Sequence, residues 1–190
     1  MATTQHDLGL SLWLLPPDSY KPYAALSRLT CTTFPASPNF PQSPGFTPHI
    51  TLTSSIPPPK SGDALLPSLS LDSFAPPEIE FGELAHGDTY FKFIFLRIKK
   101  SASLLALAKL TRESLTAGTF DDEKYDPHIS LVYSTEEATE KRVEYVAWKT
   151  SMAIGSSRGW TGGKVVLVDT RSRNVAEWKV VEEYSFHESS

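Results

Sequence analysis

A seven-residue pattern occurs twice in this sequence, as TPHITLT at residues 47–53 and as DPHISLV at residues 126–132. From the proline to the leucine, the copies differ only where the first has Thr51 and the second has Ser130. Alternating polar and aliphatic residues that run into a β-branched residue are typical of a strand. The repeat therefore predicts two similar strands, and it constrains the fold more than any other feature.

Each copy would present an imidazole and a hydroxyl on the same face. Side chains alternate between the two faces of a strand, so His49 shares a face with Thr51, and His128 shares one with Ser130. The aliphatic residues between them would anchor the other face in a core. A single histidine in a strand is most simply structural, but two near-identical copies favour a functional site.

The composition is that of an ordinary globular protein. Among 190 residues, 40% are hydrophobic and 21% are charged, and we expect one bilobal domain over residues 1–190. No apolar run approaches the roughly 20 residues that a bilayer-spanning helix needs. The start of the chain lacks the basic and apolar regions of a secretory signal, so we expect an intracellular, cytoplasmic protein without membrane association.

Charge and cysteine content narrow the possible partners. The net charge of −4 argues against a protein that grips long RNA or DNA through many phosphates, so no stable nucleic-acid complex is expected. Cys31 is the only cysteine and cannot form an internal disulfide. We interpret it as a small apolar residue on a helix, and a reactive thiol is the alternative.

The two His-x-Thr/Ser-hydrophobic motifs resemble those of the two-histidine (2H) phosphoesterase superfamily, and within it the fungal and plant cyclic nucleotide phosphodiesterases. The resemblance covers most of the chain, including an opening strand with Trp13, an aromatic stretch around Tyr90, and Tyr133 after the second motif. It implies an α+β fold with two pseudo-symmetric lobes, each an antiparallel sheet backed by helices. The motif strands would face each other across a central cleft.

The rest of the sequence predicts an alternation of strands and helices that fits this fold class. Asp18–Ser19, Ser101 and a Ser134–Glu137 capping box are candidate helix starts. Besides the motif strands, hydrophobic periodicity predicts strands at 9–15, 79–84, 89–99, 165–168 and 177–184, and helices at 20–32, 63–71, 101–116 and 134–152.

Two segments are predicted to be irregular. Prolines at every third position from 35 to 44 have the spacing of a polyproline II helix, which indicates a stiff surface loop. That loop could instead be a proline-recognition ligand or a flap over the site. Residues 155–164 hold four glycines before Lys164 but lack the spacing of a phosphate-binding loop, so we interpret them as a flexible turn.

Two imidazoles that titrate near neutral pH can supply both a base and an acid without a metal. The hydroxyls of Thr51 and Ser130 would hold phosphate oxygens as negative charge builds, and the resemblance implies that Tyr133 adds a further donor. We assign His49 as the acid and His128 as the base, although the sequence is equally compatible with the reverse.

Aromatic residues are candidates for holding a nucleobase. Trp13 is expected on the strand face opposite three leucines, where it could stack on a base or simply cover the core edge. The resemblance implies that Tyr90 or Phe91 contacts the base, whereas the sequence alone favours a position in the core or at its rim.

A zinc site is the rival explanation for paired histidines. It would need a third or fourth ligand at a fixed spacing, and only His6, His86 and His187 remain, all in polar contexts. We expect these three to be surface residues, and we expect neither a metal nor a cofactor.

The sequence thus favours a monomeric enzyme with a small nucleotide as its partner. The resemblance implies metal-independent hydrolysis of nucleoside 2′,3′-cyclic phosphates to 2′-phosphates, or of ADP-ribose 1″,2″-cyclic phosphate, a product of tRNA splicing, to ADP-ribose 1″-phosphate. The alternatives are a non-catalytic nucleotide-binding module and an enzyme of RNA end processing or 2′,5′ ligation.

Overall fold

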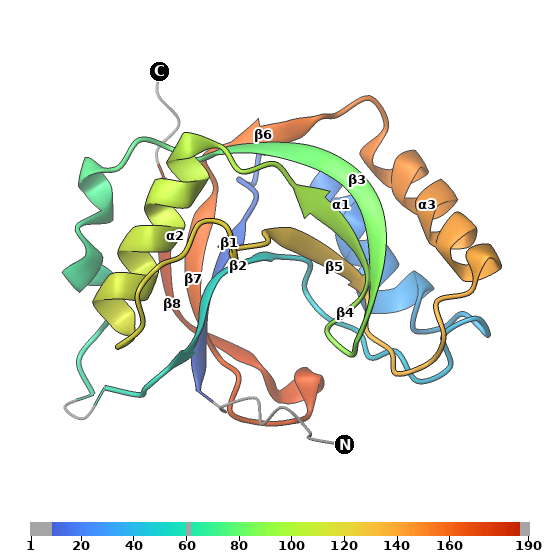
Figure 1. Ribbon diagram of the computed structural model, residues 1–190, viewed down its shortest axis with the longest axis horizontal. Coiled ribbons are helices and arrows are strands. Elements are labelled where there is room, and N and C mark those ends of the chain that lie inside the picture. The colour runs from blue at the N-terminus through green and yellow to red at the C-terminus, as the bar shows by residue number, and fades with distance from the viewer. Residues whose placement is uncertain (1–8, 60–61, 187–190) are drawn as a thin grey trace.

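An antiparallel sheet is the centre of the fold (Figure 1). The computed structural model describes residues 9–59 and 62–186, and the elements below are those of this part of the chain. The strands are β1 (Leu10–Leu15), β2 (Ile50–Ile56), β3 (Glu78–Thr89), β4 (Lys92–Ile98), β5 (His128–Val132), β6 (Gly159–Thr161), β7 (Lys164–Asp169) and β8 (Lys179–Ser185). The helices are α1 (Pro22–Arg28), α2 (Ala102–Leu115) and α3 (Glu140–Ile154). Short helical turns are Leu29–Thr33, Leu66–Leu69, Leu71–Ser73 and Val175–Glu177.

The strand order divides the sheet into two similar halves. The order is β6-β3-β4-β5-β2-β1-β7-β8, so each motif strand, β2 or β5, is the innermost strand of its half. The halves join where Ile50 pairs with Ile129, the one registered pair between β2 and β5. The predicted α+β class and the pseudo-symmetric halves are confirmed, with the motif strands as neighbours within a single sheet.

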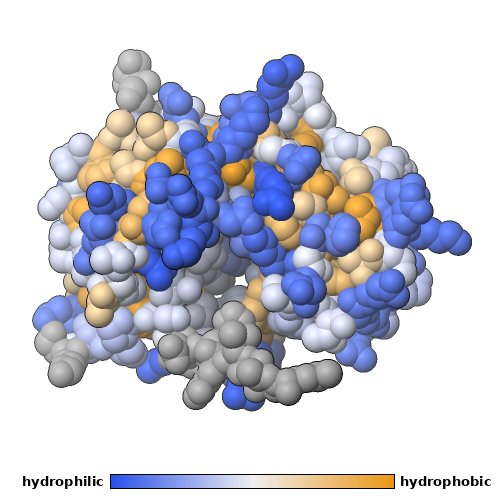
Figure 2. All heavy atoms as spheres, viewed as in Figure 1, coloured by the Kyte–Doolittle hydropathy of each residue, from blue (hydrophilic) through white to orange (hydrophobic). Residues whose placement is uncertain are grey.

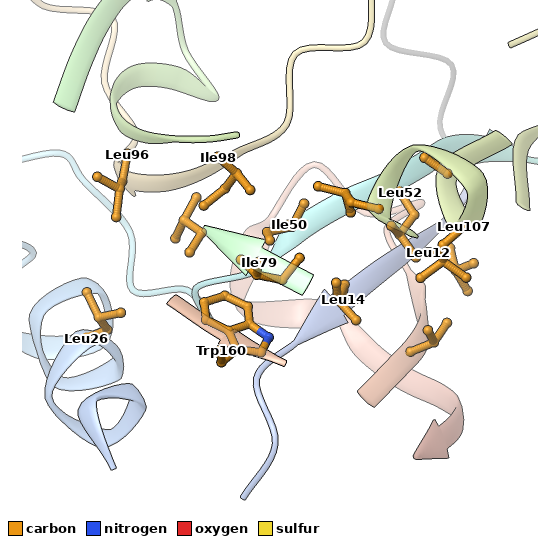
Figure 3. Packing of buried hydrophobic residues seen from close by; sticks show 14 of the residues in the cluster. Leu12, Leu14, Leu26, Ile50, Leu52, Ile79, Leu96, Ile98, Leu107 and Trp160 are labelled. Carbon is orange, nitrogen blue, oxygen red and sulfur yellow. The ribbon is translucent and has the colours of Figure 1, made fainter. Parts of the chain in front are cut away.

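One face of the sheet packs into the main core, as predicted from alternation. Ile50 and Leu52 of the first motif are 0% and 2% exposed, and Ile129 and Leu131 of the second are 2% and 0% exposed. All four belong to one core cluster. Figure 3 shows part of this cluster, with residues of β1, β2, α2 and β6 that include Leu12, Leu14, Ile50, Leu52, Leu107 and Trp160. Burial of this face places the imidazole and hydroxyl of each motif on the opposite side.

The helices flank the two halves. Helix α2 packs on β2, whereas α1 and α3 pack against each other beside the other half (Figure 1). Helix α2 begins as predicted, with the Ser101 hydroxyl accepting the Leu104 N–H at 3.2 Å. The other two predicted caps are wrong: α1 has Lys21 and α3 has Thr139 at its N-cap, and neither residue makes a side-chain cap.

The predicted third helix starts too early because Ser134 is needed elsewhere. Ser134 is buried at the end of β5, where its hydroxyl accepts the Glu136 N–H at 3.0 Å. Its backbone N–H donates to the Tyr90 carbonyl oxygen at 3.2 Å. These bonds tie residues 134–136 to the sheet, and the helix begins only at Glu140.

The β3–β4 hairpin differs from the two strands predicted at 79–84 and 89–99. Strand β3 continues to Thr89, and Tyr90–Phe91 form the turn before β4. The residues predicted to open a strand therefore lie at the hairpin tip. Likewise, the helix predicted at 63–71 is two 3₁₀ turns, in keeping with the proline at its centre.

Strand β6 was not predicted, because its glycines indicated a flexible turn. Gly159 has φ +147°, and a Cβ added there would lie 1.8 Å from the Ile79 carbonyl oxygen of the neighbouring strand. The glycine therefore permits close strand pairing between β6 and β3 rather than flexibility.

The proline-rich segment is not a polyproline II helix. Its backbone forms successive turns, with Phe40 N–H bonded to the Ser37 carbonyl oxygen at 2.9 Å and Ser43 N–H bonded to that of Phe40 at 3.0 Å. A polyproline II helix has no such internal bonds. Phe34 and Phe40 are fully buried and contact Tyr145 of α3, so the segment is anchored to the core.

The position of Cys31 differs from the expectation. Cys31 lies in the helical turn Leu29–Thr33 but is exposed rather than packed as an apolar residue. No helix within residues 9–59 and 62–186 is long and apolar enough to cross a membrane. On the face seen in Figure 2, hydrophilic residues alternate with hydrophobic patches on both sides of a central hollow.

Candidate active site

The two motif histidines lie side by side on the face of the sheet that turns away from the main core. Because Ile50 pairs with Ile129 in an antiparallel ladder, one step along each strand sets His49 across from Ser130 and Thr51 across from His128. Each imidazole is thus neighboured by the hydroxyl of the other motif. This register brings the four predicted site residues together on one face of the sheet.

Both imidazoles are held by the same local hydrogen bond. The Nδ1 atom of His49 lies 2.7 Å from the Thr47 carbonyl oxygen, and that of His128 lies 2.7 Å from the Asp126 carbonyl oxygen. A carbonyl oxygen only accepts, so Nδ1 carries the hydrogen in each ring. The proline between the two partners fixes φ and preorganises this contact. Each neutral ring therefore leaves the lone pair of Nε2 for a ligand.

The surroundings of the histidines lower the pKa of both. Burial lowers the pKa of His49 from 6.5 to about 4, against the opposing effect of the Thr47 hydrogen bond and with a further lowering by His128. Burial also lowers the pKa of His128, the hydrogen bond to Asp126 opposes this, and the charge of Lys92 adds to it. Both imidazoles are neutral at pH 7 in the free protein.

An aromatic ring packs beside each histidine at equivalent positions. Trp13 of β1 stands opposite Thr51 and stacks on His49, with ring centroids 3.6 Å apart and an interplanar angle of 7°. Phe95 of β4 stands opposite Ser130 and meets His128 edge-on at 5.1 Å. Phe95 was not predicted as a neighbour of His128, because that contact depends on the pairing of β4 with β5.

Trp13 is placed where it supports His49. It is 5% exposed, and its indole N–H donates to the Ser11 hydroxyl at 2.8 Å. The ring face toward His49 is occupied by the imidazole. Contact between Trp13 and a nucleobase stays a prediction, and the structure gives this residue a second role in the burial of His49.

The two hydroxyls have different surroundings. The Thr51 hydroxyl is partly exposed and makes no hydrogen bond within the described part of the chain, so it is available to a ligand. The Ser130 hydroxyl donates to the Phe91 carbonyl oxygen at 2.7 Å. Tyr133, which is 2% exposed, has the Ser130 side chain as a neighbour and stacks on Phe46, with ring centroids 3.8 Å apart. Tyr133 thus borders the site beside Ser130.

An aromatic cluster lies beside these hydroxyls. We use this term for Phe46, Tyr90, Phe91, Tyr133 and Trp178. Tyr90 and Phe91 come from the β3–β4 turn, and Trp178 comes from the segment between β7 and β8. Trp178 lies 5.9 Å from Phe91 and 5.8 Å from Trp13, measured between ring centroids. It therefore connects the two halves at the edge of the site.

Trp178 was missed because its position depends on loop structure. Its indole N–H donates to the Ser172 carbonyl oxygen at 2.8 Å, and the Asn174 side chain caps the short turn before it. Periodicity predicted Trp178 as part of the last strand, at 177–184, whereas β8 begins at Lys179, and nothing in that pattern indicates that Trp178 lies near the site. Only its aromatic residue between two strands could have indicated a role.

Comparison with known proteins now decides the family. A sequence model described as "Cyclic phosphodiesterase-like protein" matches residues 8–186. The chain belongs to this family. As a cyclic phosphodiesterase-like protein of the 2H superfamily, it carries both of the histidine motifs on which the resemblance was based.

Relatives and a solved structure agree with this assignment. The chain is 32% identical over 192 residues to a 2′,3′-cyclic-nucleotide 3′-phosphodiesterase of Phaeosphaeria nodorum, covering 92% of this chain and 97% of that protein. It is 31% identical over 211 residues to the enzyme of the same name from Neurospora crassa, covering 91% and 97%. The structure of Escherichia coli LigT complexed with 3′-AMP matches with a TM-score of 0.53 at 11% identity, covering 96% of this chain and 99% of LigT. This last likeness shows the shared fold.

Of the other three histidines, only His86 falls within the described residues. His86 is exposed on β3, as predicted, whereas His6 and His187 lie outside the described residues. No three His, Cys, Asp or Glu side chains of residues 9–59 and 62–186 gather closely enough to hold a metal ion.

Proposed function

We propose that this cyclic phosphodiesterase-like protein hydrolyses nucleoside 2′,3′-cyclic phosphates to nucleoside 2′-phosphates without a metal. The observation that carries the proposal is the matched pair of imidazoles on adjacent strands, each with Nδ1–H held by a carbonyl oxygen at 2.7 Å and Nε2 free. The names of the fungal relatives support cleavage of the bond to the 3′ oxygen.

The reaction needs one proton taken and one given. A neutral imidazole accepts a proton from water through Nε2 as the water oxygen attacks phosphorus. The bond between phosphorus and the 3′ oxygen breaks, and the second histidine, as imidazolium, donates its Nε2 proton to that oxygen. The phosphate stays on the 2′ oxygen, and each histidine ends in the other's initial protonation state.

Binding of the substrate favours the imidazolium that the reaction requires. Both histidines are neutral at pH 7 in the free protein because burial lowers the pKa of each. The anionic phosphate favours a positive charge beside it and raises the pKa of the ring that it contacts. The acid therefore takes up its proton as the substrate binds.

The hydroxyls stabilise charge on the non-bridging oxygens. Thr51 can donate directly, because its hydroxyl has no competing partner in the described part of the chain. Ser130 donates to Phe91 in the free protein, so its proton must turn toward the phosphate when substrate binds. Tyr133, beside Ser130, is the further donor that the family resemblance implies.

The acid is assigned to His49 and the base to His128, and a sulfur substitution tests this assignment. A substrate with sulfur at the bridging 3′ position has a leaving group that needs no proton. Removal of the acid should then cost little, whereas removal of the base should cost as much as with oxygen. We expect His49→Gln to recover activity on the sulfur substrate, and recovery by His128→Gln would reverse the assignment.

ADP-ribose 1″,2″-cyclic phosphate, the tRNA-splicing product that the family resemblance implies, is the second proposed substrate. It presents the same five-membered cyclic phosphate to the histidines. Trp178 and the turn residues Tyr90 and Phe91 are the proposed contacts for the adenine of either substrate.

The experiment measures hydrolysis of both compounds in EDTA and identifies the product by phosphorus NMR. We expect turnover to the 2′-phosphate, and the double variant His49→Ala/His128→Ala serves as the inactive control. Binding of nucleotide without turnover above that control would identify a binding module instead. Tight, steeply salt-dependent binding of oligonucleotides would favour an RNA-processing enzyme.

A further inference from the structure

The two motifs differ in the residue whose carbonyl oxygen holds the imidazole. The first motif has Thr47 there, and the second has Asp126. Asp126 therefore brings a carboxylate to one histidine and not to the other. This difference breaks the near symmetry of the site.

The Asp126 carboxylate joins two cations of the neighbouring strand β4. It forms an ion pair with Lys92, and it bonds Arg97 with a distance of 3.1 Å between Oδ1 and Nη1. Lys92 and Arg97 also lie over the Phe95 ring, at 4.9 Å and 5.4 Å from its centroid. Phe95 in turn contacts His128. The two cations and the carboxylate thus form one group beside the His128 ring.

The charges in this group act on His128 in opposite directions. After burial, which lowers its pKa most, the charges of Lys92 and Arg97 lower it further, while the hydrogen bond and charge of Asp126 raise it. From the adjacent strand, His49 also faces this group, and the charge of His128 lowers the pKa of His49. Burial raises the pKa of Asp126 itself, but its bonds to Lys92 and Arg97 hold that pKa below its usual value, so the carboxylate is charged at neutral pH.

We propose that Asp126 is a positioning residue that acts through His128: its carbonyl oxygen orients the ring, and its carboxylate offsets Lys92 and Arg97 so that the imidazolium can form. Of the two motif histidines, His128 alone has a carboxylate on the residue that holds its ring. A nearby carboxylate stabilises the imidazolium that forms when this histidine takes a proton from water. The kinetic part of this inference rests on the proposed function. The electrostatic part concerns the free protein and can be tested alone.

The variant Asp126→Asn keeps the carbonyl oxygen and removes the charge. Glu83→Gln is a matched control, because Glu83 also pairs with Arg97, at 3.7 Å, but neither its backbone nor its charge bears on either histidine. The measurement is a histidine NMR titration of the free wild-type protein and of both variants, followed by kcat and KM for 2′,3′-cyclic AMP.

We expect Asp126→Asn to lower the pKa of His128 by about 1 unit and to leave that of His49 unchanged. It should lower kcat about tenfold with little change in KM, because the imidazolium forms only during the reaction. Glu83→Gln should change neither titration nor turnover. An unchanged His128 titration in Asp126→Asn would overturn the inference.

Two further outcomes keep the test decisive. If Asp126→Asn does not fold, Lys92→Gln replaces it and should raise the pKa of His128; no rise would overturn the inference. If the pKa of His128 shifts in Asp126→Asn but the wild type hydrolyses no cyclic phosphate, the electrostatic role is supported and the proposed function is refuted. If the wild type hydrolyses cyclic phosphate but the pKa of His128 does not shift, the proposed function is supported and the inference about Asp126 is refuted.

Discussion

At the scale of single residues, each imidazole is defined by its Nδ1 partner and by the rings around it. The carbonyl oxygens of Thr47 and Asp126 make the two histidines alike in tautomer. Trp13 stacked on one ring and charged groups beside the other make them unlike in proton affinity. The two rings therefore share one tautomer but differ in proton affinity, as a site with one acid and one base requires.

Burial of His49 makes stability depend on pH. An unfolded histidine has a pKa of about 6.5, whereas folding lowers that of His49 to about 4. Between these values the unfolded chain binds more protons, so the free energy of unfolding falls as the pH falls. The full shift corresponds to about 3 kcal/mol.

When the pH is lowered from about 7 to about 4.5, the free energy of unfolding should fall in the wild type as His49 is driven toward protonation. We therefore expect that fall to be about 2 kcal/mol smaller in His49→Gln. Urea unfolding at the two pH values measures this difference. His86→Gln is the control, because His86 is exposed on β3, outside both motifs. Equal pH dependence in His49→Gln and the wild type would show that His49 titrates normally.

The residues of the site divide into those that local sequence predicts and those that it cannot. The alternation of side chains within each strand motif is enough to place the histidine and the hydroxyl on one face, which predicts His49, Thr51, His128 and Ser130 as site residues. The stack of Trp13 on His49 depends on the register between β1 and β2, where Trp13 stands opposite Thr51. Strand register is a non-local property, and a single sequence does not determine it.

At the scale of elements, the junction of β2 and β5 sets the distance between the histidines. The two strands share one registered pair, Ile50 with Ile129. The Tyr125 hydroxyl adds a second link, donating to the Thr51 carbonyl oxygen at 3.1 Å across the junction. Tyr125 lies directly before the second motif and thus ties one motif to the other.

We expect Tyr125→Phe to lose about 1 kcal/mol of stability and to lower kcat/KM about tenfold, because the histidines lose part of their relative alignment. Tyr20→Phe is the matched control, since Tyr20 shares a hydrogen bond with Ser157 at 2.9 Å away from the motifs. It should destabilise the fold similarly without altering kcat/KM. An equal loss of activity in both variants would mean that Tyr125 acts only through stability.

The segment between β7 and β8 carries Trp178 to the site. If this ring contacts the nucleobase, Trp178→Ala should raise KM for 2′,3′-cyclic AMP roughly tenfold and leave kcat within a few-fold. Trp148→Ala is the control, because Trp148 is 56% exposed on α3 and lies outside the aromatic cluster. A loss of thermal stability with unchanged KM would assign Trp178 to packing alone.

Elements were predicted well where periodicity or capping was strong and poorly where backbone contacts decided. Ser101 and the apolar stripe after it predicted α2 correctly. Strand β6 and the turns of the proline-rich segment were not predicted. They depend on Gly159, Phe34 and Phe40, which pack against residues far away in the sequence. Such contacts override the local preference of Gly and Pro.

At the scale of the whole molecule, two similar halves meet so that neither has a complete site alone. Each half supplies one histidine and one hydroxyl, and the cross-strand arrangement sets each histidine beside the hydroxyl of the other half. The repeated motif predicted this plan, since two strands that each carry half of an acid–base pair must come together to act. Which charged groups surround each histidine could not be predicted, because Lys92 and Arg97 meet Asp126 only through the pairing of β4 with β5.

The most direct test of this account is kcat/KM for 2′,3′-cyclic AMP in EDTA, measured for the wild type, His49→Ala and His128→Ala. Acid–base catalysis predicts that each single variant loses about 10²- to 10⁴-fold, and that the double variant loses little more, because the two groups act as a unit. Turnover within tenfold of the wild type in either single variant, or a wild type that works only after metal is restored, would contradict the two-histidine mechanism.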